Sequence, residues 1–323
     1  MNKYIGHDSQ VYGVEEHRLV GGKGDGMRLL QVRNGKGLDF TVVADRCADI
    51  SRLSFKGINM GYFSPCGYVA PAYYDNIGDA WLKSFTAGFL TTCGLENVGS
   101  VCVDEGEQLP LHGSIANIPA ETVYWEETKE GLVIHAVIKD ERIFSRKLVL
   151  YRDIVCSLTE NKVEIRDTIV NRGATASPAM ILYHMNMGYP LLSENARITI
   201  NSEEVVPRNA RAAEDLDTWS KVLAPQKGFE EQCYFHTCKG IGVAELVNPD
   251  VNVGLQIRFD TENLPFFTQW KMMGERDYVL GLEPGNCDPD GRDKMRAKGA
   301  LTILEPGESV SYRVEVVMLD NVK

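Results

Sequence analysis

Two of the six histidines lie in segments whose composition favours a functional site. His112 lies in residues 109–120, which are rich in small and turn-forming residues, and Gly113 after it allows a backbone or a ligand to approach closely. His184 ends an apolar run, and in an extended strand its side chain and that of Asn186 project to one face. For His112, a histidine that caps a turn is an equally good interpretation. For His184 we favour a functional role over a buried His–Asn pair.

A carboxyl group and a guanidinium extend this set of candidates. Glu283 directly follows an apolar run and precedes a Pro-Gly break. A carboxyl group at such a strand end is partly desolvated, which raises its pKa toward neutrality and suits a general base. Arg46 lies between Asp45 and Asp49, and either forms a surface ion pair or anchors a ligand hydroxyl or anion through directed hydrogen bonds. Trp270 is a candidate for stacking on a sugar face, although a single aromatic residue is more often core.

Other kinds of chemistry find little support in the sequence. There is no G-x-S-x-G motif for a serine nucleophile. A metal site is disfavoured because Asn186 is a poor transition-metal ligand beside one imidazole, and no cofactor is expected. The Gly-rich residues 21–26 lack the G-K-[ST] ending of a P-loop, so we interpret them as a surface turn. The eight cysteines form no C-x-x-C pair and are expected to be reduced thiols in a cytoplasmic protein.

The net charge of the chain indicates which kinds of partner are not expected to bind it. The chain has 323 residues, 44% of them apolar, and 34 basic against 45 acidic side chains give a net charge of -11. A negative surface repels phosphate backbones and anionic lipids, so neither nucleic acid nor membrane is an expected partner. No apolar run is long enough to span a bilayer. A small-molecule ligand is therefore expected, and a homodimer is compatible with this composition.

The elements that must position these groups are mostly strands. Residues 148–158 and 163–166 are rich in β-formers around a turn and predict a hairpin, and residues 38–43 and 132–138 predict further strands. Short helices are predicted within residues 79–85 and 209–222. We expect one all-β domain over residues 1–323, with antiparallel strands in two packed sheets, few short helices and an irregular N-terminal extension over residues 1–30. Loops at the end of such sheets suit an extended polar ligand such as a sugar.

The candidate segments together resemble a known superfamily. The chain contains, among other motifs, L-H-G at 111–113, V-N-R-G at 170–173, an H-x-N strand at 184–186, L-E-P at 282–284 and L-E-P-G-E at 304–308. This set resembles the aldose 1-epimerase (galactose mutarotase-like) superfamily. Three further segments resemble its DUF4432 branch, namely Asp45-Arg46, L-T-T-C-G-L at 90–95 and H-M-N-M-G-Y-P at 184–190.

The resemblance implies a β-supersandwich with a sugar in its cleft, and it implies roles for the matching residues. His112 would bind the sugar near its ring oxygen, and His184 would protonate that oxygen. Glu283 would take the proton of the anomeric hydroxyl, and Arg46 would contact other hydroxyls. Mutarotases carry H-x-Y-F-N where this chain has H-M-N-M-G, and they use an aspartate between the second histidine and the glutamate. No clear counterpart of that aspartate is found here, and Gln269 is a candidate only for a position in the pocket.

These residues predict an aldose 1-epimerase-like isomerase that interconverts anomers by general acid–base ring opening. One alternative is a carbohydrate-binding or sensor protein without catalysis. Another is an isomerase or lyase that acts on a ketose or a uronate with the same acid–base pair.

Overall fold

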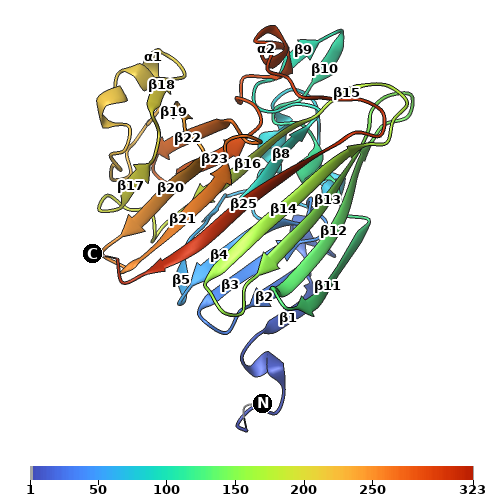
Figure 1. The fold of residues 1–323 in the computed structure, drawn as a ribbon. Helices are drawn as coiled ribbons and strands as arrows, with labels where there is room; N and C mark the ends of the chain where they lie inside the picture. The colour runs from blue at the N-terminus through green and yellow to red at the C-terminus, as the bar shows by residue number, and fades with distance from the viewer. Residues whose placement is uncertain (1–2, 323) are drawn as a thin grey trace.

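The computed structural model describes residues 3–322, which form three main antiparallel sheets and three short two-stranded pairs (Figure 1). The largest sheet has eight strands, in the order β11 (Thr122–Thr128), β12 (Gly131–Glu141), β13 (Lys147–Cys156), β14 (Lys162–Asn171), β25 (Ser309–Asp320), β21 (Val253–Asp260), β20 (Ile241–Asn248) and β17 (Arg197–Ile200). The second has six, in the order β18 (Glu204–Pro207), β19 (Gln232–Thr237), β22 (Phe266–Met273), β23 (Tyr278–Gly285), β16 (Met180–Met187) and β8 (Leu90–Leu95).

The third sheet is N-terminal and contains β1 (Gly13–Arg18), β2 (Arg28–Arg33), β3 (Leu38–Val43), β4 (Asp49–Phe55) and β5 (Ile58–Asn59). The short pairs are β6 (Tyr62–Phe63) with β7 (Ala87–Gly88), β9 (Cys102–Asp104) with β10 (Glu107–Leu109), and β15 (Ser177–Pro178) with β24 (Ile303–Leu304). The α-helices of residues 3–322 are α1 (Ala210–Ala213) and α2 (Arg292–Ala297), and single 3-10 turns cover Asp8–Gln10, Gly22–Gly24, Pro71–Tyr73, Ala80–Lys83, Ile115–Asn117 and Leu216–Thr218.

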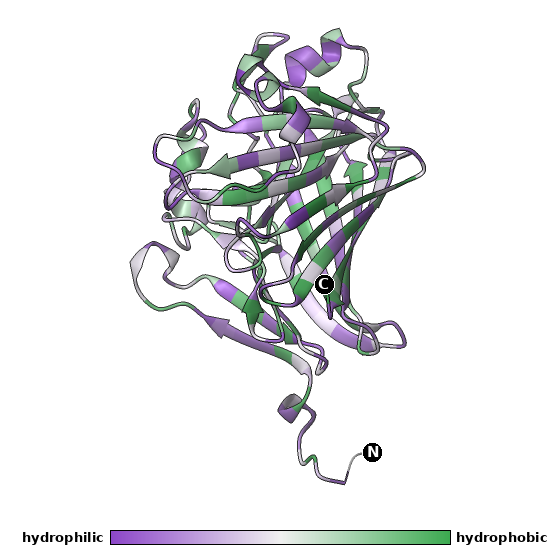
Figure 2. Cartoon of the chain, turned by 90° about the vertical axis from the view of Figure 1, so that its left-hand side faces the viewer, coloured by the Kyte–Doolittle hydropathy of each residue, from purple (hydrophilic) through white to green (hydrophobic). Residues whose placement is uncertain are grey.

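Several predicted elements are confirmed. The hairpin predicted from residue 148 onward is β13 paired with β14, and the early strand is β3. The long strands of the large sheet carry both hydrophobic and hydrophilic residues (Figure 2), and in β25 and the second half of β12 buried residues alternate with more exposed ones, which is the period of a sheet buried on one face. In β16 and β23, by contrast, every residue is buried, because these central strands of the six-stranded sheet are covered on both faces.

Three predictions need correction. The N-terminal extension over residues 1–30, predicted as irregular, contains a regular strand, because β1 pairs with β2 along its whole length and extends the N-terminal sheet; residues 1 and 2 lie outside the described residues. The helix predicted within residues 209–222 is only the one turn of α1 and a 3-10 turn, since its exposed segment has little apolar surface to pack. There are three main sheets rather than two.

One buried ionic cluster joins all three sheets. The guanidinium of Arg152, on β13, donates to Asp167 on β14 at 2.7 and 2.9 Å and to Asp49 on β4 at 2.7 Å. It also donates to the hydroxyl of Thr92 on β8, at 2.8 Å. The Tyr183 hydroxyl, on β16, donates to Asp167 at 2.8 Å. Because each charge is paired and hydrogen-bonded, the cluster can remain ionised inside the core and hold the sheets in a fixed relation.

Candidate active site

The strand register brings His184 and Glu283 together. They lie on the adjacent strands β16 and β23, where Met185 is paired with Leu282. Nδ1 of His184 lies 3.2 Å from Oε1 of Glu283. Both side chains are buried, and this approach lacks hydrogen-bond geometry, so neither atom has a hydrogen-bond partner among the described residues. An imidazole nitrogen and a carboxyl oxygen thus face each other, and both are available to bind a ligand.

His112 joins this pair from the loop after β10. Its backbone has a φ of 56°, in the left-handed region, which turns the chain sharply before Gly113. Its Nδ1 accepts a hydrogen bond from the backbone N–H of Gly99 at 3.2 Å, so the neutral ring carries its proton on Nε2. The ring centroid of His112 lies 5.5 Å from that of His184. The three residues that the sequence predicted as an acid–base set therefore meet.

These three side chains line one cavity of about 340 Å³. Its aromatic wall is made by Trp81, which stacks on Phe85 at 4.5 Å, and by Trp270, which lies edge-on to His184 at 5.3 Å. Trp81 Nε1 and Thr268 Oγ1 are buried without a partner among the described residues, like the facing atoms of His184 and Glu283. Buried polar atoms are normally hydrogen-bonded. A cavity with aromatic walls and several unpaired polar atoms is therefore shaped for a polar ligand.

Two charged residues of the cavity were not predicted from the sequence. Glu231, just before β19, accepts a hydrogen bond from Trp270 Nε1 at 2.8 Å. Arg208, just after β18, donates to Asp290 at 3.0 Å and to Ser100 at 3.1 Å. Both lie at irregular strand ends, where no local pattern marks a functional side chain.

The electrostatics of the site are dominated by burial. Desolvation lowers the pKa of His184 to about 4. Desolvation also lowers the pKa of His112 well below its usual value, with a further contribution from His184. The pKa of Glu283 is raised well above its usual value, mainly by desolvation and further by the charge of Glu231. The Glu283–His184 pair therefore favours a state with one proton, which in the empty site lies mainly on Glu283.

Three predicted binding residues lie elsewhere. Arg46 is buried beside a separate cavity of about 10 Å³, where its Nη1 donates to the carbonyl of Val69 at 2.9 Å. The Asn186 amide folds back on the carbonyl of His184, at 2.9 Å. Gln269 points to the opposite face of β22 from Trp270 and contacts His236 at 3.2 Å. The structure thus brings His112, His184, Glu283 and Trp270 to the cavity, but not these three.

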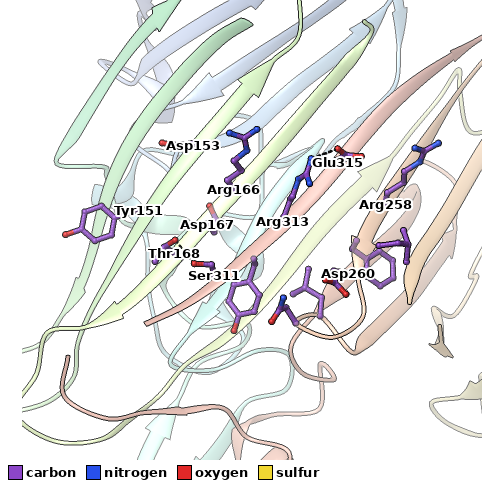
Figure 3. A pocket seen from close by; sticks show the side chains of 15 residues that line it. Tyr151, Asp153, Arg166, Asp167, Thr168, Arg258, Asp260, Ser311, Arg313 and Glu315 are labelled. Atoms are coloured by element: carbon purple, nitrogen blue, oxygen red, sulfur yellow. Dashed lines mark hydrogen bonds and ion pairs between the residues drawn. The ribbon is translucent and has the colours of Figure 1, made fainter. Parts of the chain in front are cut away.

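A wider hollow, of about 800 Å³, lies on the face of the eight-stranded sheet that carries Arg166, Arg258 and Arg313 (Figure 3). Arg313 is paired with Glu164 and Glu315, at 2.7 and 2.8 Å. None of the predicted acid–base residues lines this hollow, so the smaller cavity is the candidate active site. Within residues 3–322, no cluster of side chains has the composition of a metal site. In that same range, no helix is long and apolar enough to cross a membrane.

Comparison with known proteins identifies the family and the fold. The family called Domain of unknown function (DUF4432) matches residues 24–318. The chain belongs to the DUF4432 family. A search of curated proteins finds no match. Among solved structures, a Klebsiella pneumoniae protein provisionally named an aldose 1-epimerase is 26% identical, with a TM-score of 0.91 over 97% of this chain and 86% of that one.

More distant structures share the fold. A galactose mutarotase-like protein from Clostridium acetobutylicum is 14% identical, with a TM-score of 0.68 over 96% of this chain and 99% of that one. Galactose 1-epimerase from Lactobacillus acidophilus is 13% identical, with a TM-score of 0.66 over 96% of this chain and all of that one. The DUF4432 chain described here therefore has the galactose mutarotase-like β-sandwich fold, as the sequence predicted.

Proposed function

We propose that this DUF4432 protein is an aldose 1-epimerase-like enzyme that binds a sugar and interconverts its anomers by acid–base ring opening. The observation that carries the proposal is the 3.2 Å approach of His184 to Glu283 on the wall of an aromatic cavity. The anomeric hydroxyl and the ring oxygen of an aldose are bonded to the same carbon. A base for one and an acid for the other must therefore converge, as these two side chains do.

The reaction needs one proton on the pair. With the proton on His184, the Glu283 carboxylate takes the proton of the anomeric hydroxyl while His184 gives its own to the ring oxygen. The bond between the anomeric carbon and the ring oxygen breaks, and an open-chain aldehyde forms. The pair then again holds one proton, now on Glu283. Rotation about the adjacent carbon–carbon bond and the reverse transfers close the ring as the other anomer.

The remaining residues of the cavity have binding roles in this proposal. The N–H at Nε2 of His112 donates to the sugar near its ring oxygen, and Trp81 and Trp270 pack against its C–H faces. Glu231 lies between His184 and Glu283 in the chain and is our candidate for the hydroxyl-binding carboxylate of mutarotases. Among the described residues that line the cavity, Arg208 is the only arginine or lysine, and it is paired with Asp290, which favours an uncharged aldose over a phosphorylated or acidic sugar.

The test is the rate of anomer exchange, measured by NMR on a panel of aldoses that includes sugar phosphates. The wild type is expected to accelerate exchange of an uncharged aldose, and His184→Asn to lower the rate by about 10²–10⁴-fold, the usual contribution of a positioned proton transfer. Sugar binding without any acceleration would refute the enzymatic proposal and favour a carbohydrate sensor. Net conversion to a new compound would instead favour an isomerase or lyase.

A further inference from the structure

A second cavity, of about 770 Å³, lies beside β9 and β10, which Figure 1 shows near α2 at one end of the molecule. No part of the proposed reaction uses it. Its lining includes the buried side chain of Glu96, the polar side chains of Asn76 and Gln108, and the apolar side chains of Ile77 and Val103. The last two are 77% and 60% exposed, so the cavity opens to solvent through an apolar rim.

The wall between this cavity and the active site is shared. Three chain segments, covering residues 76–85, 96–103 and 107–114, each contribute side chains to both cavities. The backbone N–H of Leu111 donates to the carbonyl of Gly78 at 3.1 Å, and that of His112 donates to the carbonyl of Gly99 at 2.8 Å. These bonds tie the segments into one partition. The same partition therefore carries the lining of the second cavity on one side and His112 on the other.

Glu96 is the unexplained group of the second cavity. Its Oε1 accepts a hydrogen bond from the Ser114 hydroxyl at 2.6 Å and lies 3.2 Å from Arg146. Its Oε2 is buried and has no partner among the described residues. Desolvation, with a further contribution from Asp140, raises the pKa of Glu96 to about 8. Burial thus favours the protonated form of this carboxyl group, in which the unpaired end can both donate and accept a hydrogen bond.

The charges of the lining do not select an ion. Glu107 is paired with Arg142, and Arg146 is already bound to Asp140 at 3.0 Å. The free capacity is instead that of a neutral carboxyl group and of the amides of Asn76 and Gln108, beside apolar side chains. Groups that donate and accept, next to apolar surface, match the hydroxyls and C–H faces of a polyol.

We propose that this second cavity binds an uncharged carbohydrate unit and that its occupation is coupled to the active site through the shared wall. The choice of ligand rests on the function proposed above. The unit has two sources: a free sugar that acts as an effector, or the outer residue of an oligosaccharide whose reducing end lies at His184.

The test uses NMR signals that separate the two cavities in the full chain. The methyl groups of Ile77 and Val103 report on the second cavity, and the indole N–H groups of Trp81 and Trp270 report on the active site. The protein is titrated with galactose, glucose, lactose and maltose. A free-sugar effector shifts both sets of signals with two different saturation curves. An oligosaccharide shifts both with one curve, whereas a monosaccharide then shifts only the indoles.

Two variants decide whether the methyl response is direct. Val103→Trp blocks the second cavity and is expected to reduce the sugar-induced shift of Ile77 strongly, whereas the control Val20→Trp, at a residue that is 93% exposed outside it, retains the full shift. A methyl set that no sugar shifts, or an Ile77 shift as large in Val103→Trp as in the wild type, overturns the second site. Indoles that respond to no sugar would instead overturn the proposed function, so the two failures are distinguishable.

Discussion

Replacing Glu283 with glutamine should remove turnover and at the same time stabilise the fold at neutral and alkaline pH. Glu283 is buried, and its Oε1 has no hydrogen-bond partner among the described residues, so its ionised form is strongly disfavoured in the folded state. Glutamine has nearly the same shape and carries no charge. Its amide can also donate to the unpaired Nδ1 of His184, which is worth about 1 kcal/mol.

The sign and size of the effect follow from proton linkage. Because the folded-state pKa of Glu283 is raised, its contribution to stability is fully present below the unfolded pKa of about 4.3 and is lost as pH rises through the folded pKa. Within that window the free energy of unfolding of the wild type falls by about 1.4 kcal/mol per pH unit from this group. The glutamine variant has no such loss, so the stability gap between the two proteins should widen as pH rises.

The assay is urea unfolding of both proteins from about pH 5 to about pH 8, with anomer exchange measured on the same samples. Glu262→Gln, at an exposed turn between β21 and β22, is the matched control and should run parallel to the wild type. A gap between Glu283→Gln and the wild type that is constant over this range would refute the assignment of a raised pKa. Undiminished exchange in the variant would refute the role of Glu283 as the base.

Three other substitutions test separate parts of the structure. Glu231→Gln removes a charge that raises the pKa of Glu283, and the proposed reaction needs one proton on the Glu283–His184 pair, so the alkaline limb of the pH–rate profile should move to lower pH, while the amide oxygen can still accept from Trp270; an unmoved alkaline limb would contradict this coupling. Arg152→Met leaves two buried carboxylates unpaired and should cost about 3–5 kcal/mol in urea unfolding, and a loss below about 1 kcal/mol would contradict the cluster's role. Arg46→Ala should lower stability but leave KM within about twofold, because the residue lies outside the active-site cavity; a large rise in KM at unchanged stability would place it in the site after all.

The convergence of His184 and Glu283 is predicted by the resemblance to mutarotases, while the apolar runs around both residues indicate only that each lies in or at the end of a buried strand. The alternation of side chains along a strand also predicts that Gln269 faces away from Trp270. Since adjacent residues of a strand face opposite sides, Gln269 and Trp270 cannot both line one cavity. The structure places Trp270 there and turns Gln269 toward His236. Asn186 fails for a different reason, since its side chain bends back to its own strand.

The sequence does not show which charged residues line the cavity, as three cases illustrate: Arg46, Arg208 and Glu231. All three are charged residues outside regular periodicity, and the local pattern around each is equally compatible with an ion pair or a binding site. Whether such a residue reaches the cavity depends on the long-range pairing of strands, which decides which strand ends lie next to each other. Arg208 and Glu231 flank the ends of β18 and β19, which pair with each other next to β22, whereas Arg46 precedes β4 in a different sheet. No spacing along the chain encodes that difference.

Neighbouring side chains of β16 point to opposite faces of the sheet, and this explains how the buried, unpaired ring of His184 is held in place. Tyr183 points to the core and donates to Asp167 in the ionic cluster, while the next residue, His184, points to the cavity. One strand therefore anchors the proposed acid to a cluster that spans all three sheets. Proton transfer requires donor and acceptor to be held within a fraction of an ångström, which a strand fixed on both sides achieves better than a loop. By this reasoning the Arg152 cluster would affect the proposed catalysis by fixing the position of His184. Conservative substitutions of the residues packed around the cluster should therefore change the rate of anomer exchange more than they change the affinity for the sugar.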